Sequence, residues 1–199
     1  MRNVRAAVAL AALAVVPALA FAQQRAGSPK VELGMDLGLQ YTKPSGGDGY
    51  FAVGSPVSVV ESGFLAPVVL RLGVLTATKL SYELRFTGGM YSSSSSGGGT
   101  VYTVGPGLNL VYRLSGKGHA DNTYFTGGAA VDLIGSSGGG SSNSYAFFTF
   151  NAGIGLRRPW GASGASRAEA FFAYTLKNTK AEEPNTIHFG LRLGFSLFK

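Results

Sequence analysis

The sequence contains no cysteine, and only two of its 199 residues, His119 and His188, are histidines. Without cysteine, the chain has no disulfide framework, thiolate zinc site, iron–sulfur cluster or cysteine nucleophile, and no lipid-anchored N-terminal cysteine. Two histidines leave little for a histidine-based metal site. We therefore expect no metal and no cofactor, and most thiol and metal enzymes are disfavoured before any motif is considered.

Charge is also scarce. Charged residues make up 14% of the chain, whereas soluble domains carry about 25%, so the surface of an ordinary soluble enzyme would be short of charge. Glycine is abundant, with 30 residues, about twice the usual share. The glycines have no collagen period and 12% of the residues are aromatic, so neither collagen nor simple disorder fits. The length suits one folded domain.

The first 22 residues have the pattern of a secretory signal peptide. Arg2 and Arg5 precede an apolar run at 6–16, and Ala20-Phe21-Ala22 matches an A-x-A cleavage pattern. A retained membrane helix is the alternative, but the apolar run is short for that role. We predict a signal peptide at 1–22, cleaved near Ala22, followed by one domain at 23–199. No later stretch has eighteen consecutive apolar residues, so no membrane helix is expected in the mature chain.

The mature chain alternates between apolar and polar or small residues. In residues 31–41 every second side chain is apolar, and residues 187–197 repeat the pattern. A period of two indicates a strand with one apolar face. Weaker versions between them complete eight predicted strands, at 31–41, 66–75, 80–91, 101–114, 122–134, 145–157, 167–177 and 187–197.

Two features interrupt this regular pattern. Pro106 breaks the apolar face of its strand, which predicts a bulge or local kink there. The long connection 42–65 contains a strand-like piece at 50–53. We interpret that piece as an extension above a barrel; a ninth strand is the alternative, although bacterial single-chain barrels have even strand numbers. The connections 92–99 and 135–143 are rich in glycine and serine and are expected to lie in water, at the same end as 42–65 and 178–185.

The character of the polar face decides between a soluble barrel and a membrane barrel. That face carries Gly, Ser, Thr and Asn with only one or two charges per strand, and small residues suit the cramped interior of an eight-stranded barrel. Aromatic residues lie near strand ends, as in the girdles at a lipid–water interface. We therefore predict an all-β fold, an eight-stranded antiparallel up-and-down transmembrane β-barrel. Its mid-height outward residues should be Leu37, Leu72, Leu110, Phe150, Phe172 and Leu193.

The closing strand HFGLRLGFSLF and the hairpin LRLGVLTATKLSYELRF at 70–86, with the signal peptide and eight strands, resemble the small OmpA/OmpX-type outer-membrane β-barrels of Gram-negative bacteria. The resemblance covers about 23–199. It implies a monomer in the cell outer membrane, in contact with outer-membrane lipid and lipopolysaccharide and assembled by the barrel assembly machinery. Family members end their last strand on an aromatic residue, whereas here Phe198 is penultimate and Lys199 follows.

Charged residues on the inward face are the candidate site. Charges inside a barrel are costly unless they are paired, and opposite signs occur there in similar number. We predict paired networks that fill the lumen, including an Asp36–Arg192 pair across the seam and an Arg71–Glu83 pair. A narrow ion path through the same charges is the alternative. The candidate residues are Glu32, Asp36, Arg71, Glu83, Arg85, Asp132, Glu169, His188 and Arg192, with Lys177 on the same face.

No catalytic residues are predicted. Lipid A deacylases share this architecture and use a Ser/His/acid arrangement, but His188 is on the lumen face and His119 is in a turn, and neither has a recognisable serine motif. The basic residues are scattered, so nucleic-acid binding is not expected. The predicted function is therefore a structural or loop-mediated interaction role in the outer membrane. The alternatives are a narrow channel or a carrier of small hydrophobic molecules, then a lipid-modifying enzyme or a soluble periplasmic ligand-binding barrel.

Overall fold

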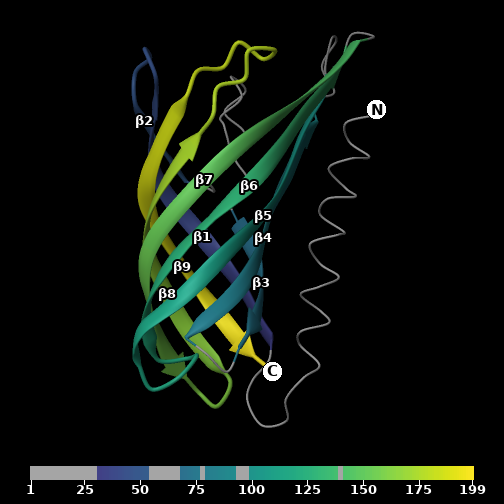
Figure 1. Cartoon of the computed structure of the whole chain (residues 1–199). Helices are drawn as coiled ribbons and strands as arrows, with labels where there is room; N and C mark the ends of the chain where they lie inside the picture. The colour runs from purple at the N-terminus through teal and green to yellow at the C-terminus, as the bar shows by residue number, and fades with distance from the viewer. Residues whose placement is uncertain (1–30, 54–67, 77–78, 93–98, 139–140) are drawn as a thin grey trace.

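A computed structural model describes residues 31–53, 68–76, 79–92, 99–138 and 141–199 (Figure 1). The predicted signal peptide, and most of the glycine- and serine-rich stretch at 92–99, lie outside the described residues. The described chain is built from antiparallel β-strands. The described residues include no helix that is long and apolar enough to cross a membrane.

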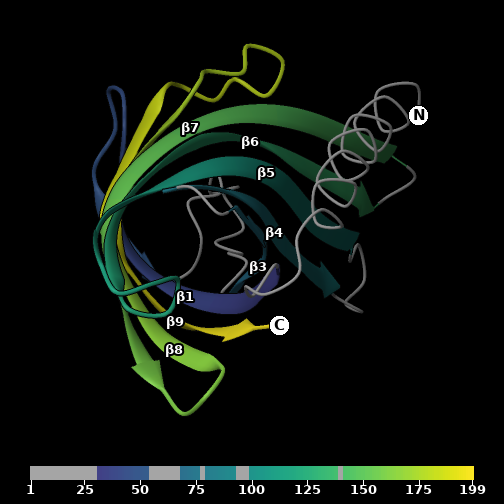
Figure 2. The same cartoon turned by 60° about the horizontal axis from the view of Figure 1, so that its bottom comes forward.

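Nine strands form one sheet that closes on itself, as the tilted view from below shows (Figure 2). Their order around the sheet is β2-β1-β3-β4-β5-β6-β7-β8-β9, and β1 also pairs with β9 over thirteen residues of each strand, from Glu32↔Phe198 to Pro44↔Thr186. The strands are β1 (Val31–Pro44), β2 (Tyr50–Val53), β3 (Val68–Leu75), β4 (Leu80–Ser92), β5 (Gly99–Gly116), β6 (Asn122–Gly138), β7 (Ser141–Trp160), β8 (Gly164–Thr175) and β9 (Thr186–Phe198).

The wall of the barrel consists of eight of these strands, and β2 is a short addition to it. β3 pairs with the lower part of β1, from Val31↔Val74 to Leu37↔Val68, whereas β2 pairs with residues 39–42 of β1. The two strands therefore share one edge of β1, with β2 above β3. The prediction of eight wall strands is confirmed, and the strand-like piece at 50–53 is a real but short ninth strand.

Of the bulge or local kink predicted at Pro106, the structure has no bulge, only a local interruption of the pairing. Pairing with β6 is interrupted at Gly105 and Pro106, yet it resumes at Gly107↔Ala130 in the register of Val104↔Leu133. On the other side Pro106 stays in register opposite Phe86 of β4. The missing N–H of proline thus removes ladder contacts locally without inserting an extra residue. The register shift in this strand falls lower down, between Arg113 and Ser115.

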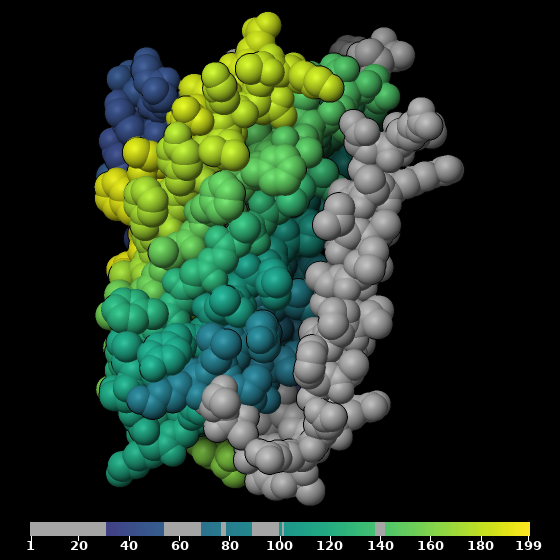
Figure 3. Space-filling model, viewed as in Figure 1, coloured from purple at the N-terminus to yellow at the C-terminus, as the bar shows by residue number. Residues whose placement is uncertain are grey.

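The two faces of the barrel wall are inverted relative to a soluble protein. Of the six predicted mid-height residues, Leu37, Leu110, Phe150, Phe172 and Leu193 are exposed, and Leu72 is partly exposed. Aromatic rings project from the outer surface (Figure 3). The side chains of opposite parity are buried, and most of them are polar or charged. The outside of the barrel is therefore apolar and the inside is polar.

The connections between strands lie at the two ends of the barrel; most of the predicted connection at 135–143 is strand instead, because β6 runs to Gly138 and β7 begins at Ser141. The β1–β2 hairpin, the β6–β7 junction and the β8–β9 connection are at the upper end in Figure 1, and the turns at 117–121 and 161–163 are at the lower end with the C-terminus. Val31 pairs with Lys199 through two backbone hydrogen bonds, so the described start and the end of the chain meet there. An aromatic cluster lies near the upper end, where the ring centroid of Tyr41 is 5.1 Å from those of both Phe51 and Phe189.

Candidate functional site: the charged lumen

The inward side chains form two layers along the barrel axis. The first is an ion-pair network in the lower half, called here the lower network. The second is a hydrogen-bonded row of neutral side chains, ending at Asp132, in the upper half, called here the upper chain. The lower network consists of Glu32, Asp36, Arg71, Glu83, Arg85, Arg157, Arg167, Glu169 and Arg192, and the upper chain of Gln40, Thr42, His188, Thr175, Thr149 and Asp132.

Glu83 is a central acceptor of the lower network. Its Oε1 accepts a hydrogen bond from Arg85 Nε at 2.6 Å, and its Oε2 accepts one from Arg167 Nη1 at 2.5 Å. Arg71 Nη1 is also within 3.3 Å of Oε2. Glu83 is 1% exposed, so its charge is compensated almost entirely by these guanidinium groups and not by water.

Arg71 joins three carboxylates at the seam of the barrel. Its Nη1 donates to Glu32 at 2.6 Å as well as to Glu83, and its Nε lies 2.7 Å from Asp36 Oδ2. The Asp36 contact is an ion pair whose geometry falls short of a directed hydrogen bond. Arg71 Nη2 continues over β1 to donate to the carbonyl of Phe195 at 3.0 Å. One side chain from β3 therefore ties together β1, β4 and β9.

Gly34 makes this crossing possible. A Cβ atom built at Gly34 would lie 2.3 Å from Arg71 Nη2 and 2.8 Å from the carbonyl oxygen of Phe195, far inside van der Waals contact. Only glycine leaves room for the guanidinium to pass over β1 to β9.

Glu169 is a second centre of the lower network. Arg192 Nη1 donates to it at 2.6 Å and Arg85 Nη2 at 3.3 Å, and Arg167 makes a very short contact with it. The hydroxyl of Tyr124 also donates to it, at 3.1 Å. Two guanidinium groups lie over the Tyr124 ring, with Arg157 and Arg167 centred 4.8 and 4.9 Å from the ring centroid. Its aromatic face adds cation–π attraction to the ion pairs.

The predicted pairings are partly replaced by others. Arg71 does contact Glu83, but its shorter contacts are with Glu32 and Asp36. Arg192 contacts Glu169 instead of the predicted Asp36, because Glu169 lies directly opposite it on β8, whereas β1 presents Gly38 at that register and Asp36 faces Gly194. Arg71, in contrast, is opposite Gly34 and reaches diagonally to Glu32 and Asp36.

Two arginines of the lower network, and the tyrosine that packs against them, were missed from the sequence. Arg157 and Arg167 lie on the inward parity of β7 and β8 and are 1% and 2% exposed, and Tyr124 on β6 is fully buried. The available signal was the alternation along their strands, which places all three on the inward face together with Glu169. They lie near the lower ends of their strands, where a basic residue is expected to reach water. In the structure these side chains instead stay buried in the interior of the barrel.

The upper chain runs through five strands. Gln40 Nε2 donates to Thr42, whose hydroxyl is 3.1 Å from His188 Nδ1. His188 Nε2 is 3.1 Å from the Thr175 hydroxyl, which is 2.9 Å from the Thr149 hydroxyl, and Thr149 donates to Asp132 Oδ2 at 3.1 Å. With Asp132 ionised, one donor order satisfies every contact: His188 carries its proton on Nε2, and Nδ1 accepts from Thr42.

Asp132 and His188 are thus separate from the lower network. Within the described part of the chain, neither makes an ion pair, and Lys177 lies exposed at the upper end instead of in the lumen. A cavity of about 30 Å³ separates the layers, with Arg85 and Arg192 on one side and Asp132 and Thr149 on the other. That volume suits one or two water molecules and no larger solute.

The lumen offers little for catalysis. Both ring nitrogens of His188 contact threonine hydroxyls in the interior, away from the outer surface where a lipid substrate would lie. The described residues contain no group of three or more His, Asp or Glu side chains placed to hold a metal ion. What the geometry offers is charge compensation: among the residues that the structure describes, five carboxylates and five guanidinium groups are buried.

Solved structures of outer-membrane barrels have a similar fold. Ail, the attachment invasion locus protein of Yersinia pestis, in complex with the heparin analogue sucrose octasulfate, is 13% identical, with a TM-score of 0.50 over 86% of this chain and 100% of that one. A second Ail structure is 14% identical, with a TM-score of 0.48 over the same shares. The N-terminal β-barrel domain of Pseudomonas aeruginosa OprF is 16% identical, with a TM-score of 0.41 over 82% of this chain and 97% of that one.

No protein-family model and no curated protein matches the chain. At identities this low, the likeness concerns the fold alone, which is that of the small outer-membrane β-barrels.

Proposed function

We propose that this chain is an integral protein of the outer membrane of a Gram-negative bacterium, and that its barrel is a closed, rigid scaffold for the connections at its upper end. Its role is structural or is carried by those connections, and it is not an enzyme. The observation that carries the proposal is the inversion of the barrel wall, with exposed Leu and Phe residues outside and a buried ion-pair network inside.

The inverted wall supports a lipid surrounding. In water, exposed residues such as Phe150 and Leu193, which are 53% and 60% exposed, would leave a continuous apolar band uncovered. In a bilayer the same band is solvated by acyl chains, and the pairing of β1 with β9 closes the wall, as a spanning sheet requires.

The paired charges in the lumen favour a plugged barrel and argue against a channel. Each carboxylate of the lower network is in contact with at least one guanidinium group, and an eight-stranded barrel is just wide enough for side chains to fill. A mobile ion would have to displace these contacts, which are stronger in a poorly hydrated interior than in water. The lumen then gives rigidity to the barrel and carries no solute.

The partners follow from this location. Lipopolysaccharide would surround the upper end, where Lys43 and Lys180 are exposed, and the barrel assembly machinery would insert the chain after cleavage near Ala22. The chain is proposed to act as a monomer, because β1 and β9 pair with each other within one chain and close the sheet.

Membrane fractionation of cells that express the full chain tests the location. The protein is expected in the outer-membrane fraction, resistant to carbonate extraction, with a folded form that migrates differently from the heated form in SDS gels. Recovery in the soluble periplasmic fraction would contradict the proposal and support the soluble ligand-binding barrel.

Planar-bilayer recording of the purified barrel separates a plug from a channel. We expect no conductance steps above the bilayer background. Reproducible steps that change size with Glu83→Gln would assign the lumen charges to an ion path and contradict the closed scaffold.

A further inference from the structure

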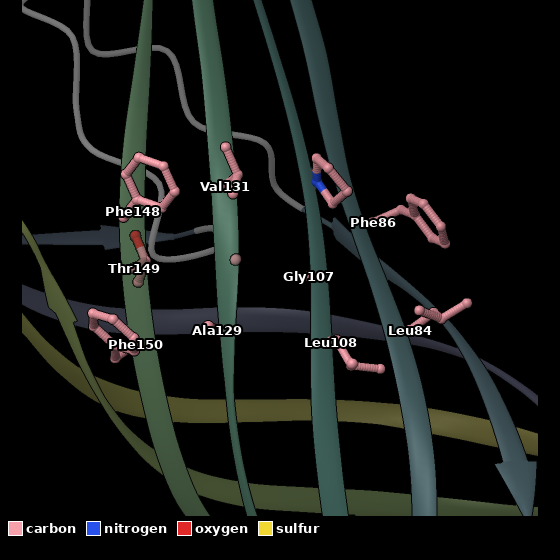
Figure 4. A pocket seen from close by; sticks show the side chains of 11 residues that line it. Leu84, Phe86, Gly107, Leu108, Ala129, Val131, Phe148, Thr149 and Phe150 are labelled. Atoms are coloured by element: carbon pink, nitrogen blue, oxygen red, sulfur yellow. The ribbon is translucent and has the colours of Figure 1, made fainter. Parts of the chain in front are cut away.

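The outer wall contains an apolar hollow of about 320 Å³ on strands β4 to β7 (Figure 4). Its centre is formed by the small side chains of Pro106 and Ala129, and its sides by Phe86 of β4 and by Phe148 and Phe150 of β7. Ala129 lies in register with Leu108 on one side and Phe150 on the other. The hollow exists because small residues on two middle strands are flanked by aromatic residues.

The size of the hollow matches part of one hydrocarbon chain. A water molecule takes up about 30 Å³ of liquid, and a methylene group is of similar size, so the hollow accommodates about ten carbon atoms. The lining groups are almost wholly apolar. A bilayer offers such a site an acyl chain, which gains close packing there but no hydrophobic transfer energy, because lipid tails are as apolar as the wall.

On the outer side of these four strands, the positive charges of the described residues lie at the lower end. Lys79 precedes β4, Lys117 follows β5, and Arg158 projects outward near the end of β7, where Asp121 holds it in an ion pair of 2.8 Å. Lys79 and Lys117 are exposed. The sequence segments 88–105 and 133–148, which form or connect the upper ends of the same strands, contain no charged residue.

The spacing fits one lipid molecule. Phe86 is seven residues above Lys79, which corresponds to roughly 15–20 Å along the membrane normal for a tilted strand. One leaflet of the hydrocarbon core is about 15 Å thick. An acyl chain whose headgroup lies beside Lys79 and Lys117 would therefore end in the hollow.

We propose that the hollow and the basic residues below it form a binding site for an anionic phospholipid of the periplasmic leaflet, with its phosphate beside Lys79 and Lys117 and an acyl chain against Ala129. The site depends on the proposed outer-membrane location. The hollow supplies shape and the lysines supply preference for negative charge, since each basic residue near a membrane surface attracts an anionic lipid.

Lipid titration by native mass spectrometry of the full-length purified barrel tests the site. Phosphatidylglycerol and phosphatidylcholine with identical chains are added in parallel. We expect tighter binding of phosphatidylglycerol, lowered about fivefold by each of Lys79→Gln and Lys117→Gln. Binding of phosphatidylcholine should not change in these variants. Lys43→Gln, at the upper end, is the matched control and should change neither.

Filling the hollow tests the part of the proposal that concerns the acyl chain. Ala129→Leu should weaken the binding of both lipids about threefold through lost packing. Ala152→Leu, at an exposed outward alanine outside the hollow, should leave the binding of both lipids unchanged. Equal effects of the two leucines, or equal affinity of the wild type for the two lipids, would overturn the site.

Two further outcomes are diagnostic. A lipid A titration that is sensitive to Ala129→Leu but not to the lysine variants would assign the hollow to the opposite leaflet and also overturn the proposal. Failure of the wild type to insert into vesicles would instead contradict the outer-membrane location itself.

Discussion

Removing the charge of Glu83 should be costly, because four guanidinium groups lie within ion-pair distance of that carboxylate. Glu83→Gln keeps the size of the side chain but leaves buried positive charge uncompensated. We expect the free energy of unfolding to fall by about 3–5 kcal/mol, measured by urea titration in lipid vesicles. Glu182→Gln, at an exposed position on the β8–β9 connection, is the control and should change it by less than about 1 kcal/mol. Equal effects would contradict the network.

The space above Gly34 is a second residue-scale requirement. A methyl group there would collide with Arg71 and with the backbone of β9, so Gly34→Ala should destabilise the barrel by about 1–3 kcal/mol. Gly118→Ala adds a methyl group in open space in a lower turn and should stay within about 0.5 kcal/mol. The same urea titration measures both, and a neutral Gly34→Ala would show that Arg71 does not need this path.

His119 gives the barrel a pH dependence at its lower, water-exposed end. Burial, with added repulsion from Arg113 and Arg157, lowers the pKa of His119 from 6.5 to about 4. The unfolded chain therefore binds more protons than the folded chain between about pH 4 and pH 6.5. Stability from this group is complete above pH 6.5 and is lost as the pH falls through that range.

The His119→Gln variant isolates this contribution. Its free energy of unfolding should fall less than that of the wild type between pH 7.5 and pH 4.5, because the group that takes up the proton is gone. Identical decreases in the two proteins would mean that His119 titrates normally.

At the scale of the strand, alternation was the most informative property of the sequence. A period of two fixes which residues share a face, and one apolar face per strand was enough to predict the eight wall strands and the orientation of residues such as Phe172. Strand ends and contacts between side chains were not predictable in the same way. The positions of Arg157 and Arg167 depend on how the lower ends of neighbouring strands are staggered, and Arg71 reaches β9 only after closure.

Alternation also predicts that the cost of an outward-facing arginine depends on its depth along one strand. Leu110 and Leu114 both point outward on β5 and are 45% and 38% exposed, but Leu114 lies four residues nearer the lower end. Leu110→Arg should therefore cost about 2–4 kcal/mol in vesicles, and Leu114→Arg about 0–1 kcal/mol. A cost that does not differ between the two positions would show that β5 does not cross the hydrocarbon where we place it.

At the scale of the whole molecule, closure of the sheet combines strands whose individual sequence patterns are weak into one fold. The long pairing of β1 with β9 encloses the charged face, and only then do residues from β3, β4, β8 and β9 meet in one network. The sequence could indicate that these charges share an interior. It could not assign partners, because side chains cross the lumen between strands that are distant in the chain, as from Arg85 on β4 to Glu169 on β8.

The central claim is that the exposed Leu and Phe band contacts lipid. Because the chain lacks cysteine, single variants Leu110→Cys and Phe150→Cys can each carry one nitroxide in the barrel reconstituted in vesicles, with Thr179→Cys in the upper connection as the water-exposed reference. Collision rates with oxygen, which concentrates in lipid, and with a water-soluble nickel chelate report the surroundings of each label. We predict that oxygen collisions dominate at 110 and 150 and nickel collisions at 179. Nickel-dominated collisions at both 110 and 150 would place the apolar band in water and contradict the account.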